Sequence, residues 1–282
     1  MTKRLGIIGY PLGHSLSPRF QQAALDALGL DVRYEAWETP PDALAQRIAS
    51  LRSPDCLGAN VTVPHKEAVL PLLDAVDEEA SSIGAVNTIV HRDGRLVGYN
   101  TDGRGFIQAL DRVGFDPQGA GVLLLGAGGA ARAVAFALAR HGASAIYIAN
   151  RTLERAQRLA KEVNAVSLVA TALPLTEVAL EEITGAYVLV VNTTTVGMRH
   201  TEAEAASPLP RRYLSRRLLV YDLVYNPSET TLLQEASAAG ARAVGGLGML
   251  VYQGAAAFEL WTGRPAPVDV MFAAAQEGLQ QA

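Results

Sequence analysis

Two kinds of apolar pattern alternate along the chain. Residues 5–9 and 122–126 are short, almost continuous apolar runs, which are typical of strands buried on both faces of a parallel sheet. Residues 32–38 alternate as a half-buried strand does, whereas residues 40–51 begin at prolines and carry apolar side chains at helical spacing. Strands that alternate with helices in this way predict an α/β fold with a mainly parallel sheet.

The same pattern continues through the rest of the chain. Ser17 and Pro18 predict the N-cap and first turn of a helix that stops at Gly29, and Asp93-Gly94 predicts a hairpin turn. Further strands are predicted at residues 56–63, 85–92, 95–100, 145–150, 186–192, 217–225 and 241–246. Further helices are predicted at residues 65–74, 78–85, 103–115, 128–142, 153–163, 247–263 and 268–279.

These elements form two α/β units, with a break near residues 101–104. The pattern does not say on which unit the last two helices, residues 247–263 and 268–279, pack. The length allows one large domain or two moderate ones, and the hydrophobic content is sufficient for full cores. We therefore expect a two-domain α/β protein.

Composition excludes several classes of partner. A net charge of −4 gives no basic surface for nucleic acid or for an anionic membrane. No apolar run approaches the roughly 18 residues that a membrane span needs. The single cysteine, Cys56, allows no intrachain disulfide, so we expect a cytoplasmic protein. The sequence carries no signal for oligomeric state and is compatible with a homodimer.

A glycine-rich turn follows the strand at residues 122–126. Gly126, Gly128 and Ala131 fit the pattern G-x-G-x-x-A between a strand and a helix, which is the context of a dinucleotide-binding fingerprint. Gly126 permits a tight turn, and Gly128 leaves room for a pyrophosphate at the positive end of the helix. The alternative is a tight structural turn without a ligand. The predicted contact residues are Gly126, Ala127, Gly128, Gly129 and Ala130.

The residues after the next strand indicate which dinucleotide binds. NAD-binding proteins usually carry an acidic residue there, to hold the ribose hydroxyls. This chain has Asn150, Arg151 and Thr152 instead, with Arg155 one helical turn later. A guanidinium suits a 2′-phosphate, so the sequence predicts NADP rather than NAD. The alternative for Arg151 is a solvated loop arginine.

Polar side chains also follow the strands of the first unit. Lys66 comes directly after the run NVTVPH, at the predicted exit of a buried strand. In open α/β sheets, ligands bind at the carboxyl ends of the strands. The alternatives are a solvated surface lysine and ordinary turn residues, and for Ser17 a helix cap. The other candidates at such positions are Ser15, Ser17, Asn60, Thr62, Asn87 and Asp102.

Several motifs in this order resemble the shikimate dehydrogenase family over essentially the full chain. They are GYPLGHSLSP, GANVTVPHK, IGAVNT, GYNTDG, LLLGAGGAARA, NRT, DLVYNP and GMLVYQGAAAF. The resemblance implies a substrate domain at residues 1–102, completed by the C-terminal helices at 247–282, and a Rossmann domain at 103–246 that binds NADP. It also implies the reversible NADPH-dependent reduction of 3-dehydroshikimate to shikimate, in the biosynthesis of chorismate and the aromatic amino acids.

The resemblance further implies the roles of individual residues. Lys66 and Asp102 correspond to the catalytic pair, and no metal is implied. Ser15 and Ser17 would hold the substrate carboxylate, with Tyr225 near it; a pair of serines favours shikimate over quinate. Ring hydroxyls would be bound by Thr62, Asn87, Asp102 and Gln253, and the cofactor by Thr193, Gly246 and Met249 in addition to the residues above.

Two rival functions remain. One is a shikimate/quinate dehydrogenase that also uses NAD, against which the NRT motif argues. The other is an NADP-binding sensor without turnover, since fold does not determine function. The presence of both Lys66 and Asp102 argues against a sensor.

Overall fold

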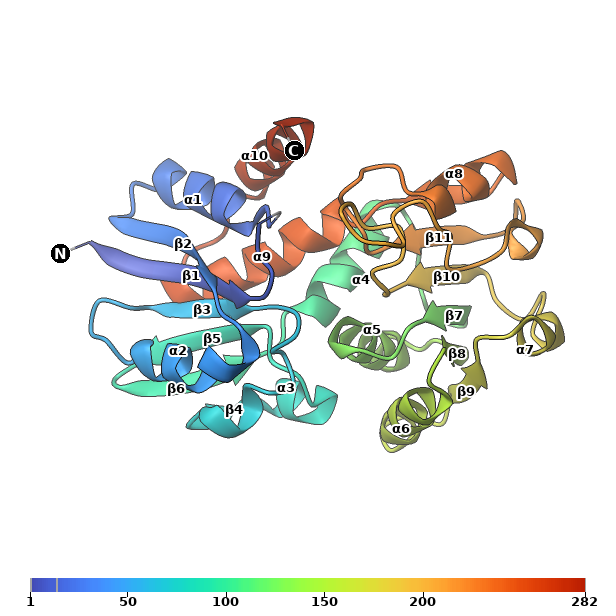
Figure 1. Ribbon diagram of the computed structural model, residues 1–282, viewed down its shortest axis with the longest axis horizontal. Helices are drawn as coiled ribbons and strands as arrows, with labels where there is room; N and C mark the ends of the chain where they lie inside the picture. The colour runs from blue at the N-terminus through green and yellow to red at the C-terminus, as the bar shows by residue number, and fades with distance from the viewer. Residues whose placement is uncertain (1, 14, 282) are drawn as a thin grey trace. The chain divides into compact units, whose positions relative to one another are not determined.

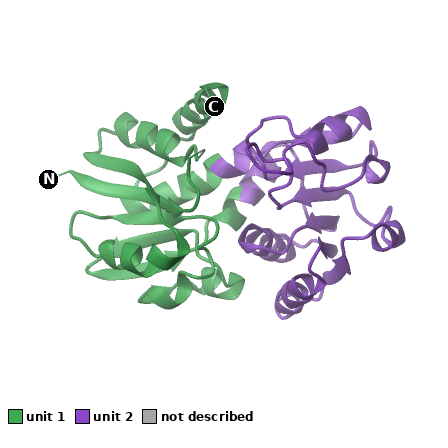
Figure 2. Cartoon of the chain, in the orientation of Figure 1, with its two compact units in different colours: residues 1–105, 251–282 green, residues 106–250 purple. Residues whose placement is uncertain are grey.

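The computed structural model describes residues 2–13 and 15–281 of the chain. They divide into two compact units (Figure 2): unit 1 comprises residues 1–105 and 251–282, and unit 2 comprises residues 106–250. The chain passes from one unit to the other within helix α4, Asp102–Arg112, and again within helix α9, Leu247–Thr262. The boundaries predicted from the sequence, after residues 102 and 246, lie three and four residues before the boundaries in the structure, which follow residues 105 and 250.

Unit 1 is built on a mixed six-stranded sheet with the order β2-β1-β3-β5-β6-β4. Strands β1, β2 and β3 are parallel to one another, as are β4 and β6, whereas β5 runs antiparallel to β3 and β6. The first residue of β5 therefore lies at the edge of the sheet where β1, β3 and β6 end. The strands are β1 (Lys3–Gly9), β2 (Val32–Glu38), β3 (Gly58–Val61), β4 (Ala75–Val76), β5 (Thr88–Arg92) and β6 (Arg95–Tyr99).

Helices cover both faces of this sheet (Figure 1). Leu44 and Ile48 of α2 pack into one cluster with Ile8, Trp37 and Ile89. On the other face the C-terminal segment returns to unit 1: α10 lies beside α1, and α9 approaches α1 closely at Gly254. The helical segments are α1 (Ser17–Ala27), η1 (Pro41–Ala43), α2 (Leu44–Ser50), η2 (Leu70–Leu72), α3 (Glu78–Ile83) and α10 (Val268–Gln281), together with α9 from Val251 onward.

Unit 2 has a six-stranded sheet in which all pairs are parallel, with the order β12-β11-β10-β7-β8-β9. This is the Rossmann order of two mirrored halves, and the order reverses between β7 and β10. The strands are β7 (Gly121–Leu125), β8 (Ala145–Asn150), β9 (Ala170–Pro174), β10 (Leu189–Asn192), β11 (Leu219–Asp222) and β12 (Arg242–Val244). The helical segments are α5 (Gly129–Arg140), α6 (Leu153–Asn164), α7 (Glu177–Glu182), η3 (Arg211–Tyr213) and α8 (Thr231–Ala238).

The predicted fold class is confirmed, and several elements lie where the sequence placed them. Strands β2 and β8 have the predicted bounds. The predicted hairpin joins β5 and β6, and its turn residues Asp93 and Gly94 both have a positive φ. No helix within residues 2–13 and 15–281 is long and apolar enough to cross a membrane.

Three local predictions were wrong. Ser17 is the first residue of α1 rather than its cap; Leu16 takes the N-cap position, and the Ser17 N–H faces the Ser15 hydroxyl instead. Strand β3 ends at Val61, and Val63 is 61% exposed, because the chain turns at Thr62, whose carbonyl accepts the His65 N–H. The helix predicted at residues 65–74 is only the short η2.

In unit 2, β9, α7, α8 and the short η3 were not predicted from the sequence. Strand β9 reads ATALP and lies at the edge of the sheet, so it lacks the long apolar run of a central strand. Helices α7 and α8 each begin at a threonine cap, Thr176 and Thr230, but they are too short to give a clear helical period.

An ion pair between loops makes the stability of unit 1 sensitive to acid. Arg52 contacts both carboxylate oxygens of Asp74, at 2.6 and 3.0 Å, and the Leu96 N–H donates to the same carboxylate. These bonds lower the pKa of Asp74 from an ordinary 3.8 to about 2. A lowered pKa means that the contribution to folding is complete above pH 3.8 and is lost as the pH falls toward 2.

Asp74→Asn should therefore weaken the acid dependence of the unfolding temperature between these pH values. Thermal unfolding at pH steps from 4 to 2 checks this, with the exposed Asp31→Asn as control. An unchanged slope for Asp74→Asn would contradict the assignment of this part of the acid sensitivity to Asp74.

Candidate active site

A lysine and an aspartate meet at the edge of the unit 1 sheet. Lys66 follows the turn after β3, and Asp102 is the first residue of α4, separated from the end of β6 by two residues. Lys66 Nζ lies 2.5 Å from Asp102 Oδ2, and the two side chains are 14% and 5% exposed. Such a pair can exchange a proton with a bound group while the carboxylate holds the amine in place.

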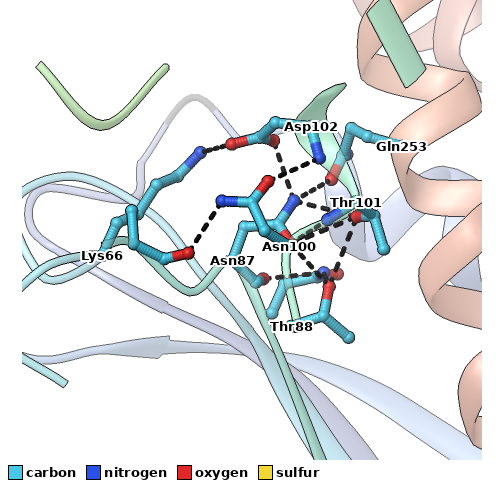
Figure 3. A network of polar contacts seen from close by, with 9 residues as sticks. Lys66, Asn87, Thr88, Asn100, Thr101, Asp102 and Gln253 are labelled. Carbon is cyan, nitrogen blue, oxygen red and sulfur yellow. Dashed lines mark hydrogen bonds and ion pairs between the residues drawn. The ribbon is translucent and has the colours of Figure 1, made fainter. Parts of the chain in front are cut away.

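Asn87 and Gln253 complete this cluster (Figure 3). Asn87 Nδ2 donates to Asp102 Oδ1 at 2.8 Å and lies 3.2 Å from Gln253 Oε1. Asp102 is thus held through both carboxylate oxygens, one by Lys66 and one by Asn87. The structure therefore brings together the four predicted residues Lys66, Asn87, Asp102 and Gln253 from the loop after β3, the start of β5, α4 and α9.

Two glycines place Gln253 beside this pair. A Cβ on Gly105 would lie 2.5 Å from the Gln253 backbone nitrogen, so α4 and α9 cross where only a glycine fits. Gly254 leaves the matching space for Phe20 of α1, and Gln21 Nε2 donates to the Gly254 carbonyl at 2.8 Å. The position of Gln253 thus follows from close helix packing.

Ser15, Ser17 and Thr62 lie in segments that leave the same edge. Strands β1 and β3 are parallel neighbours, so the loop after Gly9 and the turn after Val61 emerge side by side, and the Tyr10 N–H donates to the Val63 carbonyl. Ser15 is half-buried and Ser17 is buried. Thr62 packs its methyl group against Gly9.

Three residues that were not predicted from the sequence hold the pair in place. The Asp102 N–H donates to Asn100 Oδ1 at 3.0 Å, and the Thr101 N–H donates to Asn87 Oδ1 at 2.8 Å. Thr88 Oγ1 lies 2.9 Å from the same oxygen. The signal was the repeated Asn-Thr pair at 87–88 and 100–101, where β5 begins and just after β6 ends. His65, in contrast, is buried and bonds the Thr39 carbonyl, which fits a structural role.

In unit 2 the glycine-rich turn lies at the reversal of the strand order. Gly126 directly follows β7 and has φ +109°. A Cβ there would lie 2.6 Å from Oγ1 of Thr193, the residue just after the neighbouring strand β10. Thr193 Oγ1 donates to the Leu125 carbonyl at 2.7 Å. Ligands of open α/β sheets bind at such a reversal.

The residues of this turn fit a dinucleotide. Gly128 is the N-cap of α5, and a Cβ added to it would meet nothing within 4 Å, so its backbone is open to a ligand. Gly129 and Ala130 form the first turn of α5, whose free N–H groups favour a phosphate. Ala127, like these two residues, is partly accessible.

The predicted phosphate-binding arginines lie at the end of the next strand. Asn150 closes β8, and its side chain bonds the Thr152 carbonyl at 2.8 Å. Thr152 is the N-cap of α6, and Arg151, Thr152 and Arg155 are all exposed. The N-terminal turn of α6 thus presents two guanidinium groups to solvent beside the end of β8, where a 2′-phosphate would need them.

Asp222 ties together the loops that follow β10 and β11. Its carboxylate accepts bonds from Asn192, the Val224 N–H and Thr230, and burial raises its pKa despite these bonds. Tyr225 follows in the same loop, in unit 2, so its predicted place near the substrate carboxylate stays a prediction.

Gly246 and Met249 also belong to unit 2. A Cβ on Gly246 would lie 2.1 Å from the Leu223 carbonyl oxygen, so this position requires glycine for packing. Met249 is buried, and its N–H donates to Tyr221 Oη. Their cofactor contacts stay predictions. Among the residues that the structure describes, no group of three or more His, Cys, Asp or Glu side chains is arranged to hold a metal ion.

Gly128→Ala separates cofactor binding from folding. The methyl group has open space in the protein alone and φ is an ordinary −96°, so the unfolding temperature should not change. The same methyl should weaken NADP binding by about 1–3 kcal/mol, roughly 5- to 150-fold, by overpacking the phosphate contact. Titration calorimetry with NADP checks this. Gly13→Ala, at an equally open glycine of unit 1, is the control, and unchanged NADP affinity in Gly128→Ala would count against this site.

Three family models match successive parts of the chain. The shikimate dehydrogenase substrate binding domain matches residues 7–89, the shikimate / quinate 5-dehydrogenase model matches residues 109–229, and the shikimate 5′-dehydrogenase C-terminal domain matches residues 246–276.

Individual relatives agree with these matches. The chain is 50% identical to the shikimate dehydrogenase (NADP(+)) of Moorella thermoacetica, over 96% of this chain and 91% of the relative. It is 49% identical to that of Methanopyrus kandleri, over 99% and 97%. The crystal structure of shikimate 5-dehydrogenase from Thermus thermophilus in complex with NADP(H) and shikimate is 44% identical, with a TM-score of 0.88 over 98% of this chain and 100% of the other.

The Rossmann sheet, its glycine-rich turn and the lysine–aspartate pair of unit 1 define a dinucleotide-dependent oxidoreductase. The relatives narrow this class, because they match nearly the whole length of the chain rather than one domain. The chain belongs to the shikimate dehydrogenase family.

Proposed function

We propose that the protein catalyses the reversible NADPH-dependent reduction of 3-dehydroshikimate to shikimate, with Lys66 and Asp102 as its acid–base pair. The observation that carries the proposal is the 2.5 Å contact between Lys66 Nζ and Asp102 Oδ2. This contact lies where three strands of unit 1 end, among uncharged donors and acceptors that suit a polyhydroxylated ring.

The chemistry needs one proton and one hydride. When held at the glycine-rich turn Gly126–Ala130, NADPH would supply the hydride that the carbonyl carbon of the substrate takes up. The Lys66 ammonium then provides the proton that the forming hydroxyl needs, and in the oxidation direction the amine takes this proton back. Asp102 keeps the amine at the reacting oxygen, because its other carboxylate oxygen is held by Asn87.

Substrate binding is divided between two groups of residues. Ser15 and Ser17 offer hydroxyls to the carboxylate from the loop between β1 and α1. Thr62, Asn87, Asp102 and Gln253 offer hydrogen bonds to the ring hydroxyls. Since none of these side chains except Asp102 carries a charge, they discriminate through the number and position of hydroxyl groups, and quinate carries one hydroxyl group more than shikimate.

The preference for NADP comes from the residues after β8. The exposed Arg151 and Arg155 lie at the N-terminal turn of α6 and offer charge-assisted hydrogen bonds to a 2′-phosphate. No acidic residue lies between Asn150 and Leu153 to hold a free ribose hydroxyl, as NAD would require.

The remaining predictions concern setting and assembly. The free cysteine Cys56 is buried, which suits a reducing compartment, and we propose the cytoplasm as the place of action. The sequence is compatible with a homodimer, and we include this oligomeric state in the proposal.

The experiment is a comparison of four substrate pairs by nicotinamide absorbance: NADP or NAD with shikimate or quinate. The proposal requires reduction of NADP by shikimate at a much higher kcat/KM than any other pair. Comparable rates with NAD or quinate would make the protein a broad-specificity relative. No turnover with any pair, while NADP still binds, would favour a sensor.

A further inference from the structure

A chain of buried polar side chains leads from strand β2 of unit 1 to the Lys66–Asp102 pair. Tyr34 on β2, Asn60 on β3 and Thr88 on β5 are at most 5% exposed. Tyr34 Oη lies 2.7 Å from Asn60 Oδ1, Asn60 Nδ2 lies 3.2 Å from Thr88 Oγ1, and Thr88 Oγ1 lies 2.9 Å from Asn87 Oδ1. Asn60 and Thr88 are opposite each other in the antiparallel register, which explains their contact.

Two main-chain groups determine the orientation of the amides in this chain. The Thr101 N–H, which can only donate, lies 2.8 Å from the Asn87 side chain, so the atom facing it is the oxygen. The Asn87 carbonyl, which can only accept, lies 3.2 Å from the Asn60 side chain, so the atom facing it is the nitrogen. Each amide therefore has a single orientation compatible with its neighbours.

The direction of donation then follows along the whole chain. Burial raises the pKa of Tyr34 well above its ordinary value, so the phenol remains protonated and donates to Asn60 Oδ1. Asn60 Nδ2 donates to Thr88 Oγ1, and the hydroxyl proton of Thr88 goes to Asn87 Oδ1. The chain ends where Asn87 Nδ2 donates to Asp102 Oδ1 (Figure 3).

The Thr88 hydroxyl is the side-chain donor that holds Asn87 Oδ1 at the shortest distance. The Thr101 hydroxyl lies farther away, at 3.2 Å, and also receives an Asn87 proton at 2.9 Å. Without the Thr88 hydroxyl, the amide keeps one firm donor, the Thr101 N–H, and gains freedom to tilt about it. A tilt moves Nδ2 away from Asp102, whose other oxygen holds Lys66.

We propose that Thr88 is a positioning residue of this active site: its hydroxyl fixes the Asn87 amide, and Asn87 in turn holds Asp102 against Lys66. The inference rests on the proposed function, because it concerns the same reaction. Thr88 does not itself touch the pair, and it acts only through Asn87.

Thr88→Ser and Thr88→Ala form the matched test. Both variants lose the methyl group, so the cavity they leave is shared, and they differ in the hydroxyl. We expect kcat of Thr88→Ser to stay within about threefold of wild type and kcat of Thr88→Ala to fall about 10- to 100-fold, because misplacement by about 1 Å costs up to about 100-fold. The KM for shikimate should rise no more than about threefold. If Thr88→Ala does not fold, Thr88→Val removes the hydroxyl while keeping the volume.

The outcomes separate three explanations. Equal kcat values for the serine and alanine variants would overturn the proposal. A Thr88→Ala variant with a lower unfolding temperature but an unchanged kcat would overturn it too. Thr39→Ala is the control: Thr39 is 2% exposed in the same unit, and its hydroxyl bonds the Trp37 carbonyl, so its kcat should be that of wild type. Failure of the proposed function itself would show as an inactive wild-type protein, whereas failure of this inference leaves the wild type active.

Discussion

Replacing Lys66 by alanine is expected to lower kcat for shikimate oxidation by about 10²- to 10⁴-fold, the usual contribution of a positioned acid–base group. The KM for shikimate should change much less, because we propose that other side chains bind the ring and the carboxylate. The reason is geometric: Nζ is held 2.5 Å from Asp102 Oδ2 and remains 14% accessible to a substrate. Steady-state kinetics at saturating NADP measure both parameters.

Lys66→Arg distinguishes proton transfer from charge alone. Arginine keeps a positive charge that can pair with Asp102, but it does not deprotonate in proteins and cannot cycle a proton. We expect the arginine variant to be almost as inactive as the alanine variant. A fully active Lys66→Ala would refute the assignment, and an active Lys66→Arg would reduce the role of Lys66 to electrostatic stabilisation.

Replacing Arg151 by alanine is expected to remove most of the preference for NADP. A charge-assisted hydrogen bond contributes about 1.5–3 kcal/mol, so kcat/KM for NADP should fall roughly 10- to 100-fold while that for NAD changes little. Arg151 is exposed at the end of β8, so its loss should not affect folding. The measurement is the ratio of kcat/KM for NADP and NAD at a fixed shikimate concentration.

Arg158→Ala provides the control for this experiment. Arg158 is also exposed and lies on the same helix α6, one turn beyond Arg155. Its removal changes the net charge equally but should leave the cofactor ratio unchanged. An unchanged ratio in Arg151→Ala would refute the role of Arg151 and return Arg155 as the candidate for the 2′-phosphate.

Much of the fold follows from local pattern, and the departures have physical causes. The alternation in residues 32–38 predicted β2 with the observed bounds, although its two buried side chains, Tyr34 and Trp37, lie on opposite faces of the strand. Thr62 and Val63 are apolar enough to prolong β3, yet the chain turns there because the Thr62 carbonyl bonds the His65 N–H. Hydrophobicity alone does not reveal such a turn.

Part of the candidate site follows from local sequence, and the rest depends on contacts between distant residues. The Gly126–Gly128 turn and Arg151 followed from spacing and residue type, because a phosphate site uses backbone groups next to a strand. The pairing of Lys66 with Asp102 came from family resemblance, since the two residues are far apart in sequence. The roles of Thr88 and Thr101 depend on strand register, which places Asn60 opposite Thr88, and register cannot be obtained from a single sequence.

The most direct test of the central claim follows the hydride itself. The protein is incubated with NADP and with shikimate that carries deuterium on the carbon bearing the 3-hydroxyl group, and the reduced cofactor is analysed by mass spectrometry. The account predicts that the deuterium appears in NADPH and that the organic product is 3-dehydroshikimate. Reduced cofactor without deuterium, or an organic product that keeps the deuterium, would contradict the assignment of the reaction.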